Sequence, residues 1–299
     1  MKKLLFSALM GAMIISCNRD NDNVSPAPTI DDTSILPTKM TYSETGKADE
    51  VITFSYDENK LVKLTHNNKD VIFTYTGDLI TSVRSEDYYI KFGYDANGNL
   101  ISEYEELYRQ GDATTEKNTT YTINGSTITA EQTSGILGTE RNTFVSTITY
   151  TLDAQKRPIK IVEASEQKDT WGKITQKDDN TFIYQYADHH SFLKNIKGLD
   201  KLYYSSLTIK KEKINGLVFP FSYTRGELIT YLYDQPIGHY PSAEGYTYQT
   251  KAAYTLNTNG YPTKIAYKTR DTVTLGLYED NGYYTIEYLS LIHISEPTR

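Results

Sequence analysis

The carboxylates near residue 100 are the first side chains in this sequence with the types and spacing for chemistry. Glu103, Glu105 and Glu106 include a pair two residues apart, which on a strand shares one face. A glycosidase site needs two carboxylates placed on either side of a bond in this way. An acidic face in contact with solvent is the simpler interpretation, and we predict no catalytic residue here.

Asp95 opens a stretch whose side-chain oxygens are spaced like the ligands of a calcium loop. With Asp95 as position one, the later ligands would be Asn97, Asn99, Glu103 and Glu106. A calcium loop needs glycine at position six for its sharp turn, where this sequence has leucine. We therefore predict a simple turn and no metal site.

His189 and His190, beside Asp188, form the only histidine cluster in the sequence. Adjacent residues of a strand point to opposite faces, so the pair cannot chelate one ion, and a solvated loop is the favoured interpretation. Trp171 and exposed tyrosines could stack on sugar rings. The sequence contains no nucleophile elbow, zincin, Walker or dinucleotide motif, so we expect a non-enzymatic protein without a cofactor.

Cys17 is the one cysteine, and its position gives it a specific chemistry. Lys2 and Lys3 precede an apolar run, residues 4–15, that is shorter than the roughly 20 residues of a membrane-spanning helix and typical of a signal peptide. The run ends Ile-Ile-Ser-Cys, which resembles the lipobox of bacterial lipoproteins. The resemblance implies a signal peptide over residues 1–16 and lipidation of Cys17.

Residues 17–40 are predicted to be a lipidated, flexible tether because they are rich in Asn, Asp, Ser, Thr and Pro and have no apolar period. The polar, acidic residues 18–23 resemble the export signal that sends Bacteroidota-type lipoproteins to the outer face of the outer membrane. We expect a protein anchored in the outer membrane, with exposure at the cell surface as the finer prediction. The folded part should begin near Thr41.

The charge of the chain argues against a nucleic-acid partner. The sequence has 31 basic and 38 acidic residues, a net charge of -7, and removal of Lys2 and Lys3 leaves 29 − 38 = −9. The densest basic run, residues 210–213, is short and interrupted by Glu212, whereas phosphate binding needs clustered cations. The expected partners are the membrane, through Cys17, and a glycan or protein ligand.

Short alternating segments separated by Asn, Asp and Gly predict strands joined by tight turns from Val51 onward. The 27 tyrosines suit strand faces that are half buried and half wet. One module recurs at intervals of 19 residues: a Phe-x-Tyr strand, a polar turn and an aliphatic returning strand. Its marker residues are Tyr56, Asp57, Tyr75, Tyr94, Asp95, Gly98 and Asn99. Weaker copies begin at Tyr150 and Tyr254, and Asn124-Gly125 is a strong hairpin signal.

The segment from Tyr94 to Leu100, Tyr-Asp-Ala-Asn-Gly-Asn-Leu, resembles the YD (RHS-type) repeat. Residues 41–288 resemble uncharacterised Bacteroidota-type lipoproteins with YD-like repeats, a resemblance that also rests on residues 192–199. It implies an antiparallel meander and supplies no activity. We predict an all-β domain in which hairpins form one large twisted sheet that can curve, with at most one short helix at residues 192–202.

Three functions remain open at this point. The preferred one is a lipid-anchored, non-enzymatic binding or scaffold domain. The alternatives are a carrier of acyl chains similar to LolA/LolB, with an apolar hollow, and a glycan-processing accessory protein. Residues 289–299 are identical to the translation of a sequencing adapter, so we predict that this tail is an artefact and belongs to no site.

Overall fold

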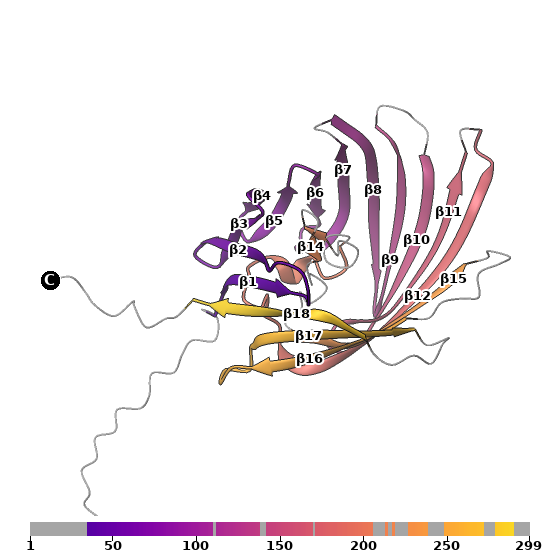
Figure 1. The fold of residues 1–299 in the computed structure, drawn as a ribbon. Coiled ribbons are helices and arrows are strands. Elements are labelled where there is room, and N and C mark those ends of the chain that lie inside the picture. Colours follow the sequence, from indigo (N-terminus) through magenta and orange to yellow (C-terminus); the bar gives the residue numbers. More distant parts are fainter. Residues whose placement is uncertain are drawn as a thin grey trace, which may run out of the picture. The chain divides into compact units, whose positions relative to one another are not determined.

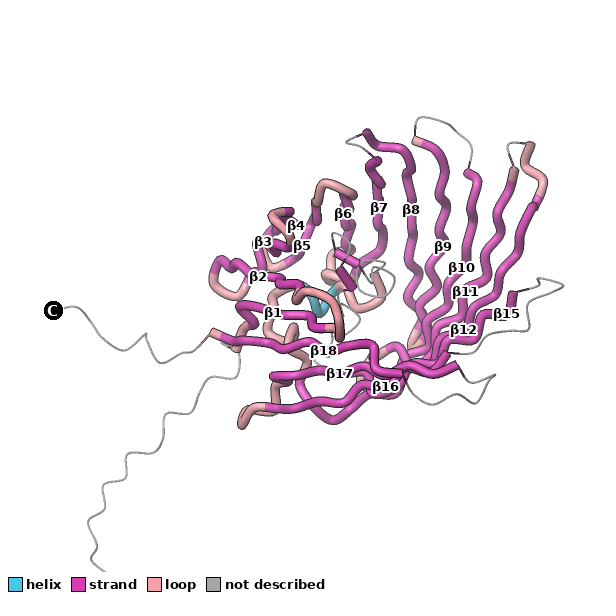
Figure 2. The backbone as a smooth tube through the Cα atoms, in the orientation of Figure 1, coloured by secondary structure: helices cyan, strands magenta, loops and turns pink. Residues whose placement is uncertain are grey.

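A computed structural model describes residues 35–109, 112–137, 142–169, 171–205, 213–214, 217–218, 227–238, 248–271 and 279–289. Nearly all of this part of the chain is β-strand (Figures 1 and 2). The elements are β1 Pro37–Ser43, β2 Glu50–Asp57, β3 Lys60–His66, β4 Lys69–Thr76, β5 Leu79–Arg84, β6 Tyr88–Tyr94, β7 Leu100–Arg109, β8 Asp112–Asn124, β9 Thr127–Ile136, β10 Asn142–Leu152, β11 Pro158–Lys168, β12 Ile174–His190, the 3₁₀ helix η2 Leu199–Lys201, β13 Lys213–Ile214, β14 Leu217–Val218, β15 Glu227–Gly238, β16 Tyr248–Leu256, β17 Pro262–Asp271 and β18 Glu279–Tyr288.

The strands form a closed antiparallel barrel. Neighbours in sequence pair with each other, except that β12 pairs with β15 and β13 pairs with β14 in a separate two-stranded sheet. β1 pairs with both β2 and β18, which closes the ring. The predicted all-β meander in one large sheet is therefore confirmed, and closure is the feature that the sequence did not predict. Near the two ends of the described residues, the Leu289 amide donates to the Leu36 carbonyl at 2.9 Å.

The repeated module produces the tight turns at one end of the barrel, here called the turn end. The ladder shifts register immediately before Tyr56, Tyr75 and Tyr94, so each of these tyrosines lies at a bulge next to a turn. Asp95 holds its turn by accepting the amides of Asn97 and Asn99 at 2.9 and 2.8 Å. Asp153 and Asn257 accept the corresponding amides in their own turns at this end, and Asp169 does so in the β11–β12 turn at the opposite end.

Tyrosine hydroxyls bind backbone carbonyls of the preceding strand at this end. Tyr56 donates to the Pro37 carbonyl at 2.8 Å, and Tyr94 donates to the Ile80 carbonyl at 2.6 Å. Tyr186 and Tyr288 repeat the contact with Pro158 and Pro262 at 2.6 and 2.7 Å. Because a buried carbonyl without a partner costs free energy, these hydroxyls explain why the module places tyrosine rather than phenylalanine beside the turn.

The inner wall near the turn end is apolar and packs against a segment that crosses the barrel. This segment, Ser191–Ser205, is here called the plug and includes η2. Its side chains Phe192, Leu193, Ile196 and Leu199 are fully or almost fully buried against the strands, and burial of each contributes about 1.5–3 kcal/mol. The predicted short helix is thus a run of turns with one 3₁₀ turn, on the inner side of the sheet.

Polar contacts fix the plug to many parts of the ring. The Asn195 amide donates to the Ile35 carbonyl at 3.1 Å and to the Tyr261 hydroxyl at 2.9 Å. The Tyr204 hydroxyl donates to the Leu100 carbonyl at 2.6 Å. The plug therefore binds the beginning of the fold, the β6–β7 connection and the β16–β17 turn together.

The first described strand begins a few residues before the predicted boundary near Thr41. β1 begins at Pro37, inside the predicted tether 17–40, and Ile35 and Leu36 before it are already buried. Met40 is fully buried in the core. No turn signal in the sequence separates the polar tether from these apolar residues, so the sequence does not mark the residue at which β1 begins. Cys17 and residues 1–34 lie outside the described residues.

Candidate functional site

The module residues predicted as markers do not converge on one site. Tyr56, Tyr75 and Tyr94 lie in different hairpins along the turn end, and burial raises the pKa of all three hydroxyls. Tyr75 donates to the Lys197 carbonyl of the plug at 3.1 Å. Asp57 begins the first turn, and Asp95 with Asn99 closes its own turn through a side-chain bond of 2.9 Å. Gly98 occupies the left-handed position of that turn, φ 74°. These residues build the fold.

Glu103 and Glu105 share a strand face, as predicted, but that face is the inner wall rather than solvent. Their exposures are 3% and 2%, so the interpretation as an acidic solvent face is wrong. Glu105 forms an ion pair with Lys117 on β8. Glu103 accepts a hydrogen bond from Tyr121, and this contact, after burial, raises the pKa of the Tyr121 hydroxyl. Partners on the neighbouring strand are what allow these carboxylates to be buried.

Glu103 begins a polar row that crosses the inner wall. In register with it on the following strands are Thr119, Gln132, Ser146 and Ser165, all buried. Gln132 donates to the Thr119 hydroxyl at 3.1 Å, and Ser146 donates to Gln132 at 3.4 Å. The inner wall is therefore aliphatic near the turn end and polar farther along β7–β11.

The histidine pair and the calcium-like stretch show no geometry for a metal. Among the described residues, no three His, Cys, Asp or Glu side chains come together as metal ligands. The His190 ring lies 5.1 Å from the Tyr261 ring, and Lys194 contacts its Nδ1 at 3.2 Å. Trp171 is 90% exposed in the β11–β12 turn, with its amide bound by Asp169 at 2.9 Å.

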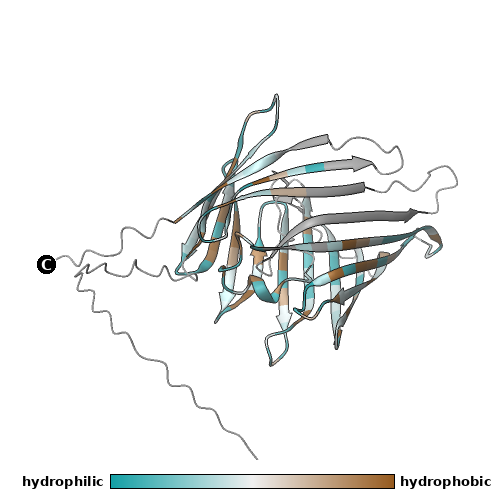
Figure 3. Cartoon of the chain, turned by 90° about the horizontal axis from the view of Figure 1, so that it is seen from below, coloured by the Kyte–Doolittle hydropathy of each residue, from teal (hydrophilic) through white to brown (hydrophobic). Residues whose placement is uncertain are grey.

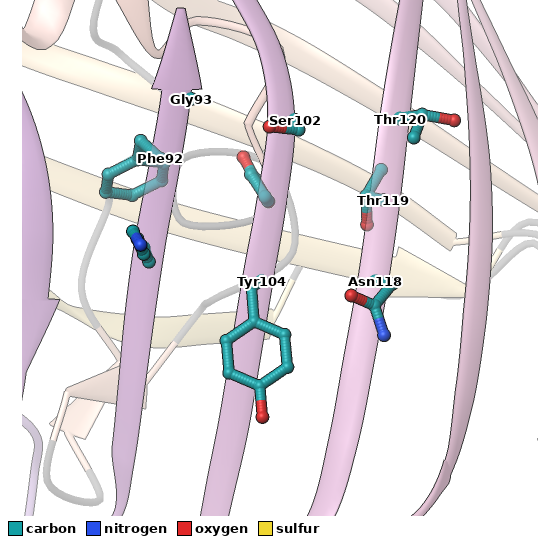
Figure 4. Close-up of a pocket in the computed structure, with 9 residues that line it drawn as sticks. Phe92, Gly93, Ser102, Tyr104, Asn118, Thr119 and Thr120 are labelled. Carbon is teal, nitrogen blue, oxygen red and sulfur yellow. The ribbon is translucent and has the colours of Figure 1, made fainter. Parts of the chain in front are cut away.

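A shallow depression on the outer wall of β6, β7 and β8 is the best candidate for a binding site (Figure 4). It has a volume of about 290 Å³ and lies between two rows of outward-facing residues. One row is Gly93, Ser102 and Thr120, and the other is Lys91, Tyr104 and Asn118. The residues between the rows, Phe92, Glu103 and Thr119, are buried on the inner side and contribute backbone. We call this feature the outer depression.

Two properties of the outer depression bear on ligand binding. Within the part of the chain that the structure describes, the side chains of Lys91, Ser102, Asn118 and Thr120 have no hydrogen-bond or ion-pair partner. The Tyr104 hydroxyl is held by Glu106 at 3.0 Å. Burial, followed by the Glu106 hydrogen bond, raises the pKa of Tyr104 to about 12, so the phenol is neutral at ordinary pH.

The sequence prediction missed this site. Its residues come from three strands and carry no motif, and only cross-strand register brings Gly93 opposite Ser102 and Tyr104 opposite Asn118. One signal was present, because glycine inside a strand often marks a place where something approaches the backbone closely. Gly93 stands inside the Phe-x-Tyr part of the module, where the other two copies have Ser55 and Thr74.

Comparison with known proteins gives a fold and no activity. No family model matches the sequence, and no curated protein matches it. A porin-like protein from Bacteroides vulgatus ATCC 8482 superposes with a TM-score of 0.55 and 16% identity, over 86% of this chain and 100% of that one. A porin-like protein from Bacteroides uniformis ATCC 8492 gives a TM-score of 0.46 and 14% identity, over 85% and 97%. The chain shares the β fold of the first of these proteins, across that protein's whole length.

Proposed function

We propose that this chain is a lipid-anchored protein of the bacterial outer membrane whose barrel stands in water as a non-enzymatic binding or scaffold domain. The polarity of the outer wall carries this proposal. The lipobox-like sequence at Cys17 and the polar tether after it support the anchor, and the similarity to the porin-like protein from Bacteroides vulgatus supports a cell-envelope setting. The finer prediction, exposure at the cell surface, rests on the acidic residues that follow Cys17.

Most outward positions of the long strands β8–β12 are polar, although a few, such as Ile183, are exposed aliphatic residues. Figure 3 colours the chain by hydropathy. A barrel that spans a membrane carries an apolar band about 25 Å tall on its outside. Here the outward positions of β8–β12 include many Thr and charged residues and few apolar ones: Glu116, Asn118, Thr120, Thr122, Thr127, Thr129, Glu131, Thr133, Val145, Thr147, Thr149, Thr151, Lys160, Val162, Ala164, Glu166, Lys177, Asp179, Thr181 and Ile183. Lys160 and Lys177 alone would each cost about 2–4 kcal/mol at the middle of a bilayer. This wall suits water. Separately, no described helix is long and apolar enough to span a membrane.

The interior argues against an acyl-chain carrier. A carrier similar to LolA/LolB needs an apolar hollow that stays free for lipid. In this barrel the aliphatic part of the inner wall is occupied by the plug, whose Phe192 and Leu199 are fully buried. Farther from the turn end, the inner wall carries the polar residues Glu103, Thr119 and Gln132. Acyl chains need an apolar lining, so this part of the wall does not suit them.

A glycan-processing enzyme would need paired buried carboxylates. Among the described residues, three carboxylates are buried on the inner wall: Glu103, Glu105 and Glu163. Glu105 is neutralised by Lys117, and Glu103 accepts the Tyr121 hydroxyl. Glu163 and Glu103 both raise the pKa of the buried Tyr150. These partners make the carboxylates part of a buried network, whereas the outer depression opens on the opposite face of the sheet. The binding role is therefore the better supported one.

Cell fractionation tests the anchor and the setting. Cys17→Ala should move the protein from the membrane to the soluble fraction, while Thr29→Ala in the tether should leave it membrane-bound after a carbonate wash. Protease treatment of intact cells should cleave the wild-type chain if it lies at the cell surface. Retention of the Cys17→Ala protein in membranes, or stepwise conductance when the purified chain is added to a planar bilayer, would refute the proposal.

A further inference from the structure

We propose that the outer depression binds one sugar ring of a neutral glycan, with Tyr104 as the stacking platform. The inference deepens the proposed binding role of the barrel and rests on it. It names a site and a ligand class, and both follow from the residues that line the depression.

The Tyr104 ring is fixed in position before any ligand arrives. Its hydroxyl donates to Glu106 Oε1 at 3.0 Å, and Tyr108 donates to Glu106 Oε2 at 2.5 Å, so one carboxylate holds two tyrosines. Glu116 on β8 also bonds the Tyr104 hydroxyl. A ring that is already immobilised loses little conformational entropy on binding. One face of a pyranose exposes C–H groups, and such a face packs on an aromatic ring.

The polar side chains around the ring suit hydroxyl groups. The Asn118 amide donates and accepts, the Ser102 and Thr120 hydroxyls do the same, and the Lys91 ammonium donates. Some charged groups elsewhere on the outer wall are paired across strands, as in Lys63–Asp70 at 3.4 Å and Lys177–Glu166 at 2.6 Å. Lys91 faces Tyr104 across the β6–β7 ladder instead of a carboxylate. The polar groups of the outer depression are therefore available to a ligand.

Gly93 creates the space. It lies opposite Ser102, and a Cβ added at this position would collide with the Ser102 hydroxyl. The volume of about 290 Å³ is at the lower end of the range for ligand pockets, which is enough for one sugar ring and too small for a folded partner.

Charge selects a neutral glycan over an acidic one. Lys91 is the single cation among the lining side chains, whereas Glu106, Glu116 and Glu131 face outward within one or two residues of Tyr104, Asn118 and Thr120 in the ladder. Their combined charge repels uronates, sulfated sugars and phosphates, consistent with the net charge of -7 of the chain.

A glycan array tests this inference: the full-length Cys17→Ala chain is bound to an array of neutral and acidic glycans. Titration calorimetry then measures its affinity for the best neutral oligosaccharide. Tyr104→Ala should weaken that binding by about tenfold or more, because it removes the aromatic stacking platform. Gly93→Thr should abolish it by filling the hollow. Tyr283→Ala removes another outward-facing tyrosine, on β18 beneath Lys264, and is the matched control that should bind like the unsubstituted chain.

The outcomes separate this inference from the proposed function. The site is supported if the chain binds neutral glycans selectively and if Tyr104→Ala and Gly93→Thr each remove this binding. Binding that survives both substitutions, preference for acidic glycans, or absence of glycan binding overturns it. Circular dichroism and urea unfolding of each variant show whether a loss comes from unfolding, and Lys91→Gln, which preserves the wall, should weaken binding on its own. Membrane release of Cys17→Ala is measured independently of all these results.

Discussion

Gly198→Ala should be among the most destabilising single-methyl changes in this chain, because Gly198 of the plug packs directly against the β4–β5 turn of the barrel. Gly198 has φ 80°, and an alanine in the left-handed region costs about 1–2 kcal/mol. Its Cβ would lie 2.7 Å from the Asp78 carbonyl oxygen and 3.2 Å from the Ile80 amide nitrogen. These neighbours are backbone atoms that cannot rotate away, so overpacking adds about 1–3 kcal/mol. The expected loss is about 2–5 kcal/mol, or roughly 4–20 °C in Tm for a domain of this size.

Gly125→Ala is the matched control for this prediction. Gly125 has φ 61° in the β8–β9 turn, but no atom lies within 4 Å of an added Cβ. The control therefore carries the backbone penalty without the steric one. Urea and thermal unfolding of the non-lipidated Cys17→Ala chain, followed by circular dichroism, should separate the two variants by about 1–3 kcal/mol. Equal midpoints for Gly198→Ala and Gly125→Ala would refute the close seating of the plug on the β4–β5 turn.

Three further predictions address the tyrosines and the tail. Tyr94→Phe removes the 2.6 Å bond to the Ile80 carbonyl and should lower the free energy of unfolding by about 0.5–1.5 kcal/mol, whereas Tyr283→Phe on the outer wall should change it by less than about 0.5 kcal/mol; equal effects in urea unfolding would contradict the role of these hydroxyls. Burial raises the pKa of Tyr94, Tyr121 and Tyr150 above the ordinary value near 10, so their neutral forms stabilise the fold below about pH 10 and that stability is lost as the pH rises further; phenolate absorbance and circular dichroism should change together, and ionisation of all tyrosines near pH 10 in a native-like protein would be the contrary result. Deletion of residues 289–299 removes the Leu289–Leu36 backbone bond and should shift Tm by only a few degrees at most, and a collapse of the fold would show that the tail is needed.

The sequence predicted the local structure of the barrel better than its closure. The Phe-x-Tyr and Asp-x-x-Gly patterns contain the turn chemistry itself, because Asp95 supplies the acceptor and Gly98 the left-handed backbone that the turn needs. Closure depends on the pairing of β1 with β18, whose residues are more than two hundred positions apart in sequence. No local pattern encodes that contact.

Burial of charge was the second limit. Glu103 and Glu105 look like surface residues because their partners, Tyr121 and Lys117, come from another strand. Alternation along β7 places both on one face, but it does not say whether that face is the inside or the outside of the ring. The sequence did not predict the outer depression for the same reason, because its residues come together only through the register of β6, β7 and β8.

Alternation also explains how this chain can share the fold of the porin-like protein from Bacteroides vulgatus while most of its outward positions on β8–β12 are polar. In a closed sheet successive side chains point to the inside and the outside, so a pattern of polar and apolar residues that is displaced by one position exchanges the two surfaces without altering the strand pairing. In this chain Ile128, Ala130 and Gln132 of β9 point inward, and Thr129 and Glu131 point outward. A barrel with apolar residues at the outward positions of every strand would face lipid.

Here the inward positions near the turn end are apolar, and an apolar inner wall in a ring of this size needs something to pack against. The plug meets that need, so the polarity of the strands and the presence of the plug are two consequences of one pattern. Substitutions that make the outer wall apolar should therefore leave the plug in place, because the apolar inner wall near the turn end would still need it.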